Sequence, residues 1–286
     1  MQLGIELRRL REKAGKTPAD AGRALDCVTA KISRIELGQT GISLGDLKLL
    51  LEFYGADADH AAHLVELSRD NRRRGRWTGD RAVMPSWFRT FFDLESDAAD
   101  IRIVESEVVP GLFQTERYMR ALFEINPGLE TLTDVDAAVR SRQEHQALLD
   151  RADPPTVSCV LSESCVRRVV GGGAVMAGQL EHLVALAARP RVQLQLWPFD
   201  GEPAPGIANG RFVLLRIGAP RSEPGFTFAY CEDPDDARYI DDPGGLRIYE
   251  SIWGALQAAA LGPAETRSRL AVIARDYAKG SPDAPD

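Results

Sequence analysis

Residues 28–38 read Val-Thr-Ala-Lys-Ile-Ser-Arg-Ile-Glu-Leu-Gly, and this stretch decides how the first part of the chain folds. Ile32 and Ile35 are three residues apart, so they share one face of a helix, and Gly38 supplies a stop signal. We therefore predict a helix over residues 28–37 with both isoleucines facing a core. Val28 has no side-chain oxygen, so it cannot cap this helix.

A first and a second helix are expected before this stretch. Apolar residues recur at helical spacing from Leu3 to Ala14, and Gly15 ends that pattern. A new start signal follows, because Thr17 can cap a helix and Pro18 suits its first position. The second helix is short and ends near Leu25.

A fourth and a fifth helix are expected after it. Ser43 and Asp46 repeat the cap pattern before an apolar stripe that runs to Tyr54, and a further helix covers about residues 57–70. Two short helices joined by a tight turn and braced by others form a helix-turn-helix arrangement. Periodicity alone would also fit a small helical bundle that does not bind DNA.

Length and composition predict two domains in a soluble protein. The 286 residues exceed the usual single-domain size, and 44% are apolar while 27% are charged. The chain shows neither a secretion signal nor a long uncharged apolar run, and its four cysteines form no Cys-x-x-Cys pair. We therefore expect a cytoplasmic protein without a membrane partner, whose cysteines are reduced and buried.

Charge is distributed unevenly along the chain. The net charge of −7 divides into +3 for residues 1–81 and −10 for residues 82–286. Binding to phosphates depends on the local face presented to the duplex and not on the sum over the chain. The distribution favours a nucleic-acid module at the N-terminus, attached to an acidic body.

Specific residues of the first segment resemble those of the helix-turn-helix family that includes the phage repressors and Cro, often called the XRE type. The Ile-Ser-Arg-Ile-Glu-x-Gly run at residues 32–38 is the most specific part of this resemblance. The other matching residues are Gly4, Leu7, Arg8, Leu10, Arg11, Gly15 and Leu25. The resemblance implies an all-α domain of five helices that binds double-stranded DNA as a transcriptional regulator.

The resemblance also assigns candidate DNA-binding residues. It makes residues 28–37 the recognition helix, with Thr29, Ala30 and Arg34 at positions that reach base edges in the major groove. Lys31 and Ser33 match positions nearer the DNA backbone. Arginine can grip the O6 and N7 atoms of guanine, while threonine and alanine can contact the thymine methyl group.

Further family positions concern the helix ends and a buried pair. Arg11 and Glu36 match a buried ion pair that ties the first helix to the third. Thr17 at the start of the second helix completes the candidate DNA-binding set. The chain departs from the family at Pro18, where a DNA-contacting glutamine is usual, and at Asp26, where a glycine usually takes a left-handed conformation.

The remainder of the chain is expected to form a linker and a larger domain. Residues 69–77 form the most basic window of the chain, which could track DNA phosphates or form a solvated linker whose arginines pair with the acidic body. Either way it marks a boundary, so the predicted domains are 1–70 and 82–286, with a basic linker at 71–81. The predicted helices of the second domain cover residues 112–123, 135–149, 176–188 and 263–278, and the predicted strands cover 156–161, 192–197, 212–217 and 226–230. The overall fold class is therefore α+β, and its sheet is small and mostly antiparallel.

The second domain also carries a resemblance, to the C-terminal domain of a set of actinobacterial XRE-type regulators. The Val-Pro-Gly-Leu-Phe-Gln-Thr run at residues 109–115 is its most specific part. The other matching residues are Glu105, Tyr118, Arg142, Gln143, Glu163, Pro198, Phe199 and Gly206. The resemblance implies transcriptional control in an antitoxin-like arrangement beside a small partner protein, and it implies no catalysis.

Enzymatic and metal-binding alternatives find little support in the sequence. His60 and His63 are three residues apart, but no second pair of ligands accompanies them. The glycines at 171–173 lack the Lys-Ser/Thr of a phosphate loop, and the acidic residues at 232–236 lack the ligand spacing of an EF-hand. We expect no enzyme activity, no cofactor and no metal.

Two partners besides DNA are expected. A homodimer on an inverted repeat follows from the family, because two-fold protein symmetry is mirrored in the operator. The large second domain suggests a regulatory role, for which Trp197, Phe199, Tyr230, Tyr239 and Trp253 offer aromatic area. Its acidity disfavours an anionic small effector and favours a small partner protein with a basic surface, and a small-molecule effector is the alternative. A protein–protein adaptor that does not bind DNA is a third possibility.

Overall fold

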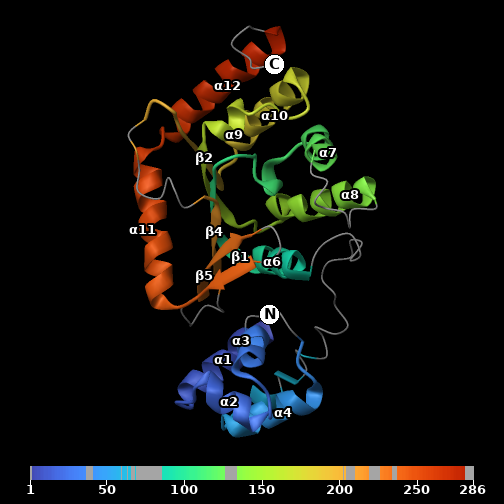
Figure 1. The fold of residues 1–286 in the computed structure, drawn as a ribbon, viewed down its shortest axis with the longest axis vertical. Coiled ribbons are helices and arrows are strands. Elements are labelled where there is room, and N and C mark those ends of the chain that lie inside the picture. The colour runs from blue at the N-terminus through green and yellow to red at the C-terminus, as the bar shows by residue number, and fades with distance from the viewer. Residues whose placement is uncertain are drawn as a thin grey trace. The chain divides into compact units, whose positions relative to one another are not determined.

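The computed structural model describes residues 2–36, 41–58, 60–62, 64–65, 68, 86–125, 134–201, 203, 210–218, 226–233 and 237–280. The chain divides into two compact units, each of which is described by itself. The first contains the N-terminal helices and residues 86–94. The second contains the sheet, with the helices that lie between and after its strands (Figure 1). The predicted linker at 71–81 lies outside the described residues.

The smaller unit is all helical, as the sequence predicts. Its helices are α1 (Gln2–Lys13), α2 (Pro18–Ala24), α3 (Thr29–Glu36) and α4 (Leu44–Phe53), and further helical residues lie between 58 and 68. Together they bury an apolar core that includes Leu7, Ile32, Leu47 and Leu64. Burial of one apolar stripe from each helix holds this unit together.

Local signals set the helix ends in this unit. The Thr17 hydroxyl accepts a hydrogen bond from the backbone N–H of Asp20 at 3.2 Å, and Ser43 does the same for Asp46 at 3.0 Å. Asp26, in the turn between α2 and α3, has a φ of 51°. The left-handed conformation expected there is therefore present, although the residue is not glycine.

Gly4 sets how closely α1 approaches α3. A Cβ at this position would lie 2.5 Å from the carbonyl oxygen of Glu36 and 2.6 Å from that of Ile35. These are backbone atoms, which cannot rotate away as the end of a side chain can.

We expect Gly4→Ala to force the two helices apart and to destabilise the unit by about 1–3 kcal/mol, the usual cost of overpacking. Gly45→Ala is the matched control, because a Cβ there meets only the Ser43 hydroxyl at 3.8 Å. Thermal unfolding of the full chain measures both variants. Equal midpoints for the two would show that the approach of α1 to α3 is not tight.

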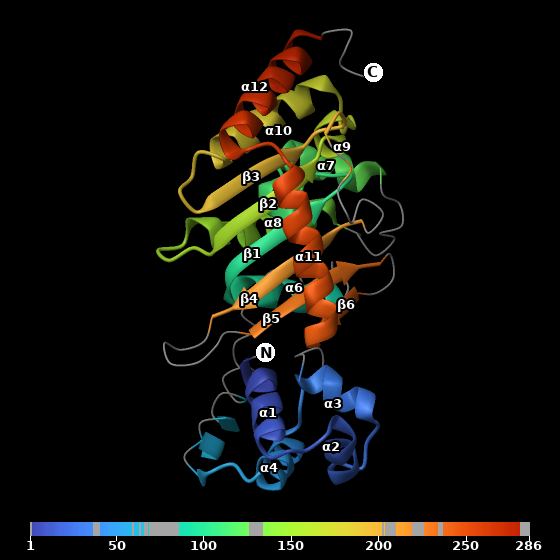
Figure 2. The ribbon, with the colours of Figure 1, turned by 90° about the vertical axis from the view of Figure 1, so that its left-hand side faces the viewer.

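The larger unit is built on a six-stranded sheet with the order β3-β2-β1-β4-β5-β6 (Figure 2). The strands are β1 (Ala98–Glu105), β2 (Thr156–Ser162), β3 (Val192–Trp197), β4 (Phe212–Ile217), β5 (Phe226–Glu232) and β6 (Ala237–Ile240). In the described residues, β1 pairs in parallel with β2, and β2 with β3, while β4, β5 and β6 continue the sheet antiparallel. The α+β class is confirmed, and the sheet is mixed, with three antiparallel ladders against two parallel ones.

The parallel strands require crossover connections, and helices supply them. The first crossover carries η1 (Gly111–Phe113), α7 (Glu116–Ile125), α8 (Val135–Gln146) and η2 (Ala147–Asp150), and the second carries α9 (Ser164–Arg167) and α10 (Gly173–Leu186). Consecutive right-handed crossovers in one direction leave their helices on one face of the sheet. α7, α8 and α10 lie toward that face (Figure 1). α6 (Ser86–Asp97) directly precedes β1 in the chain, and its residues 86–94 belong to the first unit.

Two long helices complete the larger unit. α11 (Pro243–Ala259) covers the opposite face, where Trp253 and Leu256 pack on Val104, Phe212 and other residues of the strands. α12 (Pro263–Lys279) packs against α10 and against β3. No helix among the described residues has the length and apolar character needed to span a membrane.

Candidate nucleic-acid interface

The turn between α2 and α3 brings these two short helices into close contact. The backbone N–H of Cys27 donates to the Gly22 carbonyl at 2.8 Å. A Cβ on Gly22 would lie 2.8 Å from the Cys27 carbonyl oxygen, so the small residue permits the approach. The pair thus forms a rigid corner, with α3 held against α2 and α1.

α3 has one buried side and one exposed side. Ile32 and Ile35 are buried in the core, whereas Thr29, Ala30 and Arg34 are exposed. The structure therefore brings the three predicted base-contacting residues onto a common solvent-facing surface at the start and middle of the helix. The Arg34 guanidinium Nε donates to the Ala30 carbonyl at 3.3 Å, and nothing in the described residues pairs with its charge.

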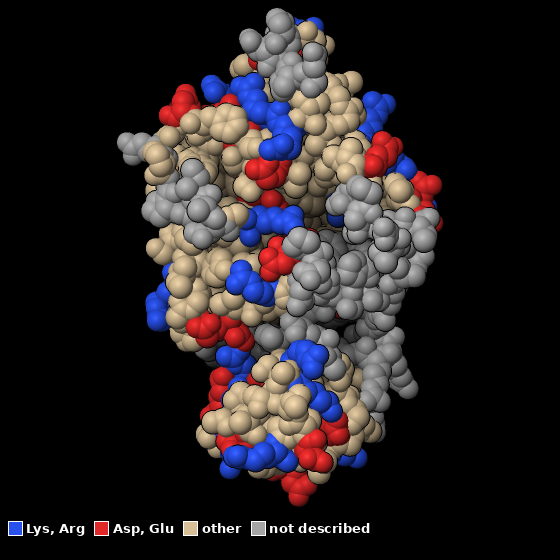
Figure 3. Space-filling view, in the orientation of Figure 1, with Lys and Arg blue, Asp and Glu red and all other residues tan. Residues whose placement is uncertain are grey.

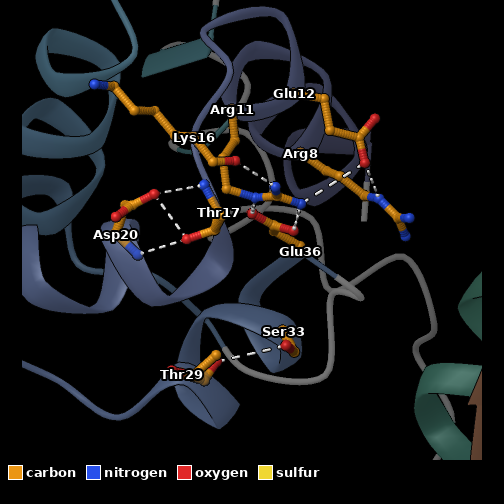
Figure 4. Close-up of polar contacts among 9 residues, drawn as sticks. All are labelled: Arg8, Arg11, Glu12, Lys16, Thr17, Asp20, Thr29, Ser33 and Glu36. Carbon is orange, nitrogen blue, oxygen red and sulfur yellow. Dashed lines mark hydrogen bonds and ion pairs between the residues drawn. The ribbon is translucent and has the colours of Figure 1, made fainter.

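Lys31 and Ser33, the residues predicted to lie nearer the DNA backbone, are half-buried. The Lys31 ammonium lies 3.5 Å from a carboxylate oxygen of Asp46 on α4. The Ser33 hydroxyl donates to the Thr29 carbonyl at 3.4 Å, as Figure 4 shows. Both side chains are thus already held by neighbours in the protein.

Thr17 lies at the N-terminus of α2, where its side chain is used as a cap. Its hydroxyl donates to the Asp20 carboxylate at 2.7 Å, and its backbone N–H donates to the same group at 2.8 Å (Figure 4). These two hydrogen bonds lower the pKa of Asp20 to about 2. In this geometry the Thr17 hydroxyl proton is not free to meet a phosphate.

Arg11 and Glu36 form a buried bidentate ion pair between α1 and α3. The Arg11 Nε and Nη2 atoms lie 2.7 and 3.0 Å from the two carboxylate oxygens of Glu36, and Nη1 donates to the Lys16 carbonyl at 2.9 Å (Figure 4). The hydrogen bond to Glu36 raises the pKa of Arg11. The pair fixes the end of α3 and therefore the direction in which its exposed side points.

Val28 is the residue of this surface that the sequence analysis did not assign. It directly precedes α3, and the residue is 68% exposed, beside Thr29 on the solvent-facing side of the helix. An exposed methyl-bearing side chain beside Thr29 can contact the thymine methyl group. The sequence held a signal for this: Val28 is an apolar residue that can neither cap the helix nor extend the buried stripe of Ile32 and Ile35.

The structure also gathers the C-terminal residues that carry the second resemblance. The Tyr118 hydroxyl accepts from the Val109 N–H at 3.2 Å, and Gln114 donates to the Val109 carbonyl at 2.6 Å. Arg142 donates to Gln114 at 2.7 Å. Glu163 is buried and accepts from the Phe199 N–H at 3.0 Å, while Gly206 lies outside the described residues.

Neither a metal site nor a disulfide is seen among the described residues. No three His, Cys, Asp or Glu side chains there gather as metal ligands. His60 lies 3.4 Å from a Glu6 carboxylate oxygen, and His63 is outside the described residues. All four cysteines are free thiols, of which Cys27 is the least buried.

Comparison with known families gives two matches. Residues 2–64 match a family described as a helix-turn-helix domain, and residues 88–272 match one described as a domain of unknown function (DUF5753). Comparisons with curated proteins and with solved structures gave no significant match. The first match covers α1 to α4, including the exposed side of α3 described above.

Proposed function

The chain belongs to the DUF5753 family and begins with a helix-turn-helix domain, and on this premise we propose that it is a sequence-specific DNA-binding transcriptional regulator of the XRE type. The exposed side of α3 carries the proposal: Thr29, Ala30 and Arg34 face solvent, while the opposite side is fixed in the core. A helix presented in this way fits the major groove of B-DNA. Such a function places the protein in the cytoplasm, and it requires no enzyme activity.

Each side chain of this surface has a defined part in the proposed contact. Arg34 reads a guanine through its O6 and N7 atoms, which is worth about 1–3 kcal/mol of discrimination. Val28, Thr29 and Ala30 offer methyl groups to thymine. Lys31 and Ser33 lie on the phosphate side, whereas the Thr17 donors are taken by Asp20.

A homodimer on an inverted repeat is part of the proposal. One α3 offers few base contacts, and two copies related by a two-fold axis would read two half-sites of one operator. In this proposal the larger unit supplies the dimer contact, and the smaller unit presents α3.

We further propose that the larger unit modulates operator binding through a small partner protein, in an antitoxin-like arrangement. Phe199 supports this, because 68% of its side chain is exposed, whereas Tyr230 and Trp253 are buried and cannot anchor a partner. A small-molecule effector is the alternative. The effector alternative is favoured by a group of buried charged residues in the larger unit, which is described in the next subsection.

Replacing Lys31 by alanine tests the phosphate contact. Loss of the cation also leaves the Asp46 carboxylate beside the duplex, so we expect weaker binding to all sequences alike. The slope of log K against log salt should flatten by about one unit for each phosphate group that the variant no longer binds. Electrophoretic shift titrations of the full chain at several salt concentrations measure both effects.

Lys279→Ala is the matched control for this experiment. It removes the same charge from an exposed position at the end of α12, which belongs to the larger unit. An unchanged salt slope for Lys31→Ala would remove Lys31 from the interface. Failure of the unmodified chain to shift any promoter fragment would instead favour the adaptor alternative.

A further inference from the structure

Four charged side chains gather at one edge of the sheet in the larger unit, and we call Glu105, Arg142, Arg211 and Glu232 the edge cluster. Successive residues of a strand face opposite sides of a sheet. Val104 and Cys231 pack on the α11 side, so Glu105 and Glu232 face the other side, toward α8. Arg142 comes from α8 itself. The cluster therefore lies between the sheet and α8.

The position of the cluster within the sheet is typical of ligand sites. β1 ends at Glu105, β5 ends at Glu232, and Arg211 directly precedes β4, so these three residues share one edge. β1 pairs in parallel with β2 on one side and antiparallel with β4 on the other. In open α/β sheets, ligands bind beyond the carboxyl ends of the strands where the strand order reverses. In this sheet the order reverses between β1 and β4, and Glu105 lies at the carboxyl end of β1.

Side chains of both charges run down the middle of the larger unit on the face shown in Figure 3. Other charged groups in and near the cluster are paired. Arg211 lies 3.2 Å from Glu232, and on α8, one turn beyond Arg142, His145 forms a buried hydrogen bond with Glu95. Paired buried charges are the usual arrangement in a protein interior.

Arg142 and Glu105 depart from that pattern. Arg142 donates through Nη1 to the neutral Gln114 amide oxygen and lies over the Phe123 ring at 5.1 Å. Its Nε atom is buried without a hydrogen-bond partner among the described residues, and so is the Oε2 atom of Glu105. Leaving such groups unsatisfied costs about 1–3 kcal/mol each, and more when they are charged.

Burial disfavours the charged form of both groups, so it shifts their pKa values in opposite directions. It raises the pKa of Glu105 to about 8, and it lowers the pKa of Arg142 to about 10. At pH 7 the Glu105 carboxyl is therefore mostly protonated and can donate a hydrogen bond, while Arg142 remains a cation. Among the described residues Arg142 has no ion pair of its own, because Glu232, the carboxylate that acts on it at longer range, is already paired with Arg211.

We propose that the edge cluster binds a small organic oxoanion, with Arg142 holding its carboxylate or phosphate group and Glu105 donating a hydrogen bond to an oxygen of the same molecule. Arg142 offers Nε and Nη2 as adjacent parallel donors, the geometry that suits a two-oxygen anion. The binding stands independently of DNA recognition. Only its consequence, a change in operator affinity, rests on the proposed function.

Calorimetric titration of the full chain tests the binding. The probes are L-lactate for a hydroxy acid and inorganic phosphate for a phosphate group, with agmatine as a cation of similar size. We expect one of the two oxoanions to bind and agmatine not to bind. Arg142→Gln should weaken that binding at least about tenfold, or about 1.4 kcal/mol, and Arg142→Lys should restore part of it.

Arg140→Gln is the matched control, because Arg140 is exposed on the same helix and pairs at 3.8 Å with Asp134. It should bind the oxoanion as the unmodified chain does. Binding of neither lactate nor phosphate, preference for agmatine, or equal affinity in Arg142→Gln would each overturn the proposal. Circular dichroism of each variant shows whether its fold is retained.

The pH dependence separates a direct role of Glu105 from a structural one. As pH rises through about 8, Glu105 loses its proton, so it loses its donor and repels the anion, and binding should weaken. The groups that face it are Arg211, Glu232, Tyr118, Cys159 and Cys165. Burial raises the pKa of the tyrosine and of both thiols, so these three stay protonated in this range.

Glu105→Gln should bind the oxoanion with no such fall near pH 8, since an amide keeps its N–H donors. A fall that persists in this variant would contradict the role given to Glu105. Oxoanion binding without any operator binding would refute the regulator proposal and leave this one intact. Operator binding without oxoanion binding would refute the oxoanion proposal and leave the regulator proposal intact.

Discussion

Replacing Arg34 by alanine is expected to relax the base preference at one position of each half-site. It should also weaken operator binding by about 1–3 kcal/mol in each half-site, and a dimer has two of them. The reason is geometric: Arg34 is exposed on the free side of α3, and its only hydrogen bond in the described residues is to the Ala30 carbonyl. Competition between operators that differ at single base pairs measures both effects.

Arg275→Ala is the matched control for this substitution. Arg275 is also exposed, and its Nε atom donates to the carbonyl four residues earlier, at 3.1 Å, but it lies on α12. Its removal should leave both affinity and base preference unchanged. If Arg34→Ala bound the operator as tightly as the unmodified chain, the assigned register of α3 on the DNA would be wrong.

Replacing Arg11 by alanine should destabilise the smaller unit by about 3–5 kcal/mol. The substitution leaves the Glu36 carboxylate buried without its partner, and an uncompensated buried charge carries a cost of that size. The loss should appear in α1 and α3, the helices that the pair joins. Hydrogen–deuterium exchange of the full chain, followed over residues 2–36, measures it without depending on the larger unit.

Arg8→Ala gives the comparison on the same helix. Arg8 pairs at 2.8 Å with Glu12, but that pair is at the surface, so its loss should cost less than about 1 kcal/mol. Combining Arg11→Met with Glu36→Leu should recover much of the stability, because an apolar pair leaves no charge unpaired. Equal protection in Arg8→Ala and Arg11→Ala would show that the buried pair does not hold α1 to α3.

The elements that could be predicted are those whose signals are local. Thr17 and Ser43 cap helices where the cap patterns predict them, and β3 and β4 have the bounds that their apolar patterns indicate. Strand β1 was not predicted, although Asp100 and Arg102 alternate with the buried Ile101 and Ile103, as expected of a strand with one buried face. In the sheet the side chains of Asp100 and Arg102 neutralise each other at 3.0 Å.

Helix α11 was not predicted either. It begins Pro243-Gly244-Gly245, and glycine disfavours helix, so the start reads as a loop. Packing explains the second glycine, since a Cβ on Gly245 would lie 2.4 Å from the Ile240 side chain of β6. A contact between two elements thus overrides local propensity, and a pattern read along the chain does not contain it.

The two candidate sites also differ in whether they could be predicted from local sequence. The exposed residues of α3 follow from helical periodicity and from the resemblance, so Thr29, Ala30 and Arg34 could be named in advance. The edge cluster could not, because Glu105 and Glu232 are far apart in sequence and only the order of the strands brings them to one edge.

Selection of bound fragments from a random pool of duplex DNA, with the full chain as bait, tests the central claim most directly. We predict enrichment of one short motif in two inverted copies, with centres about 10–10.5 base pairs apart or a multiple of that spacing. The Arg34→Ala variant should enrich a motif that is degenerate at one position of each copy. A pool that stays random after repeated rounds would contradict the assignment of α3 as a recognition helix.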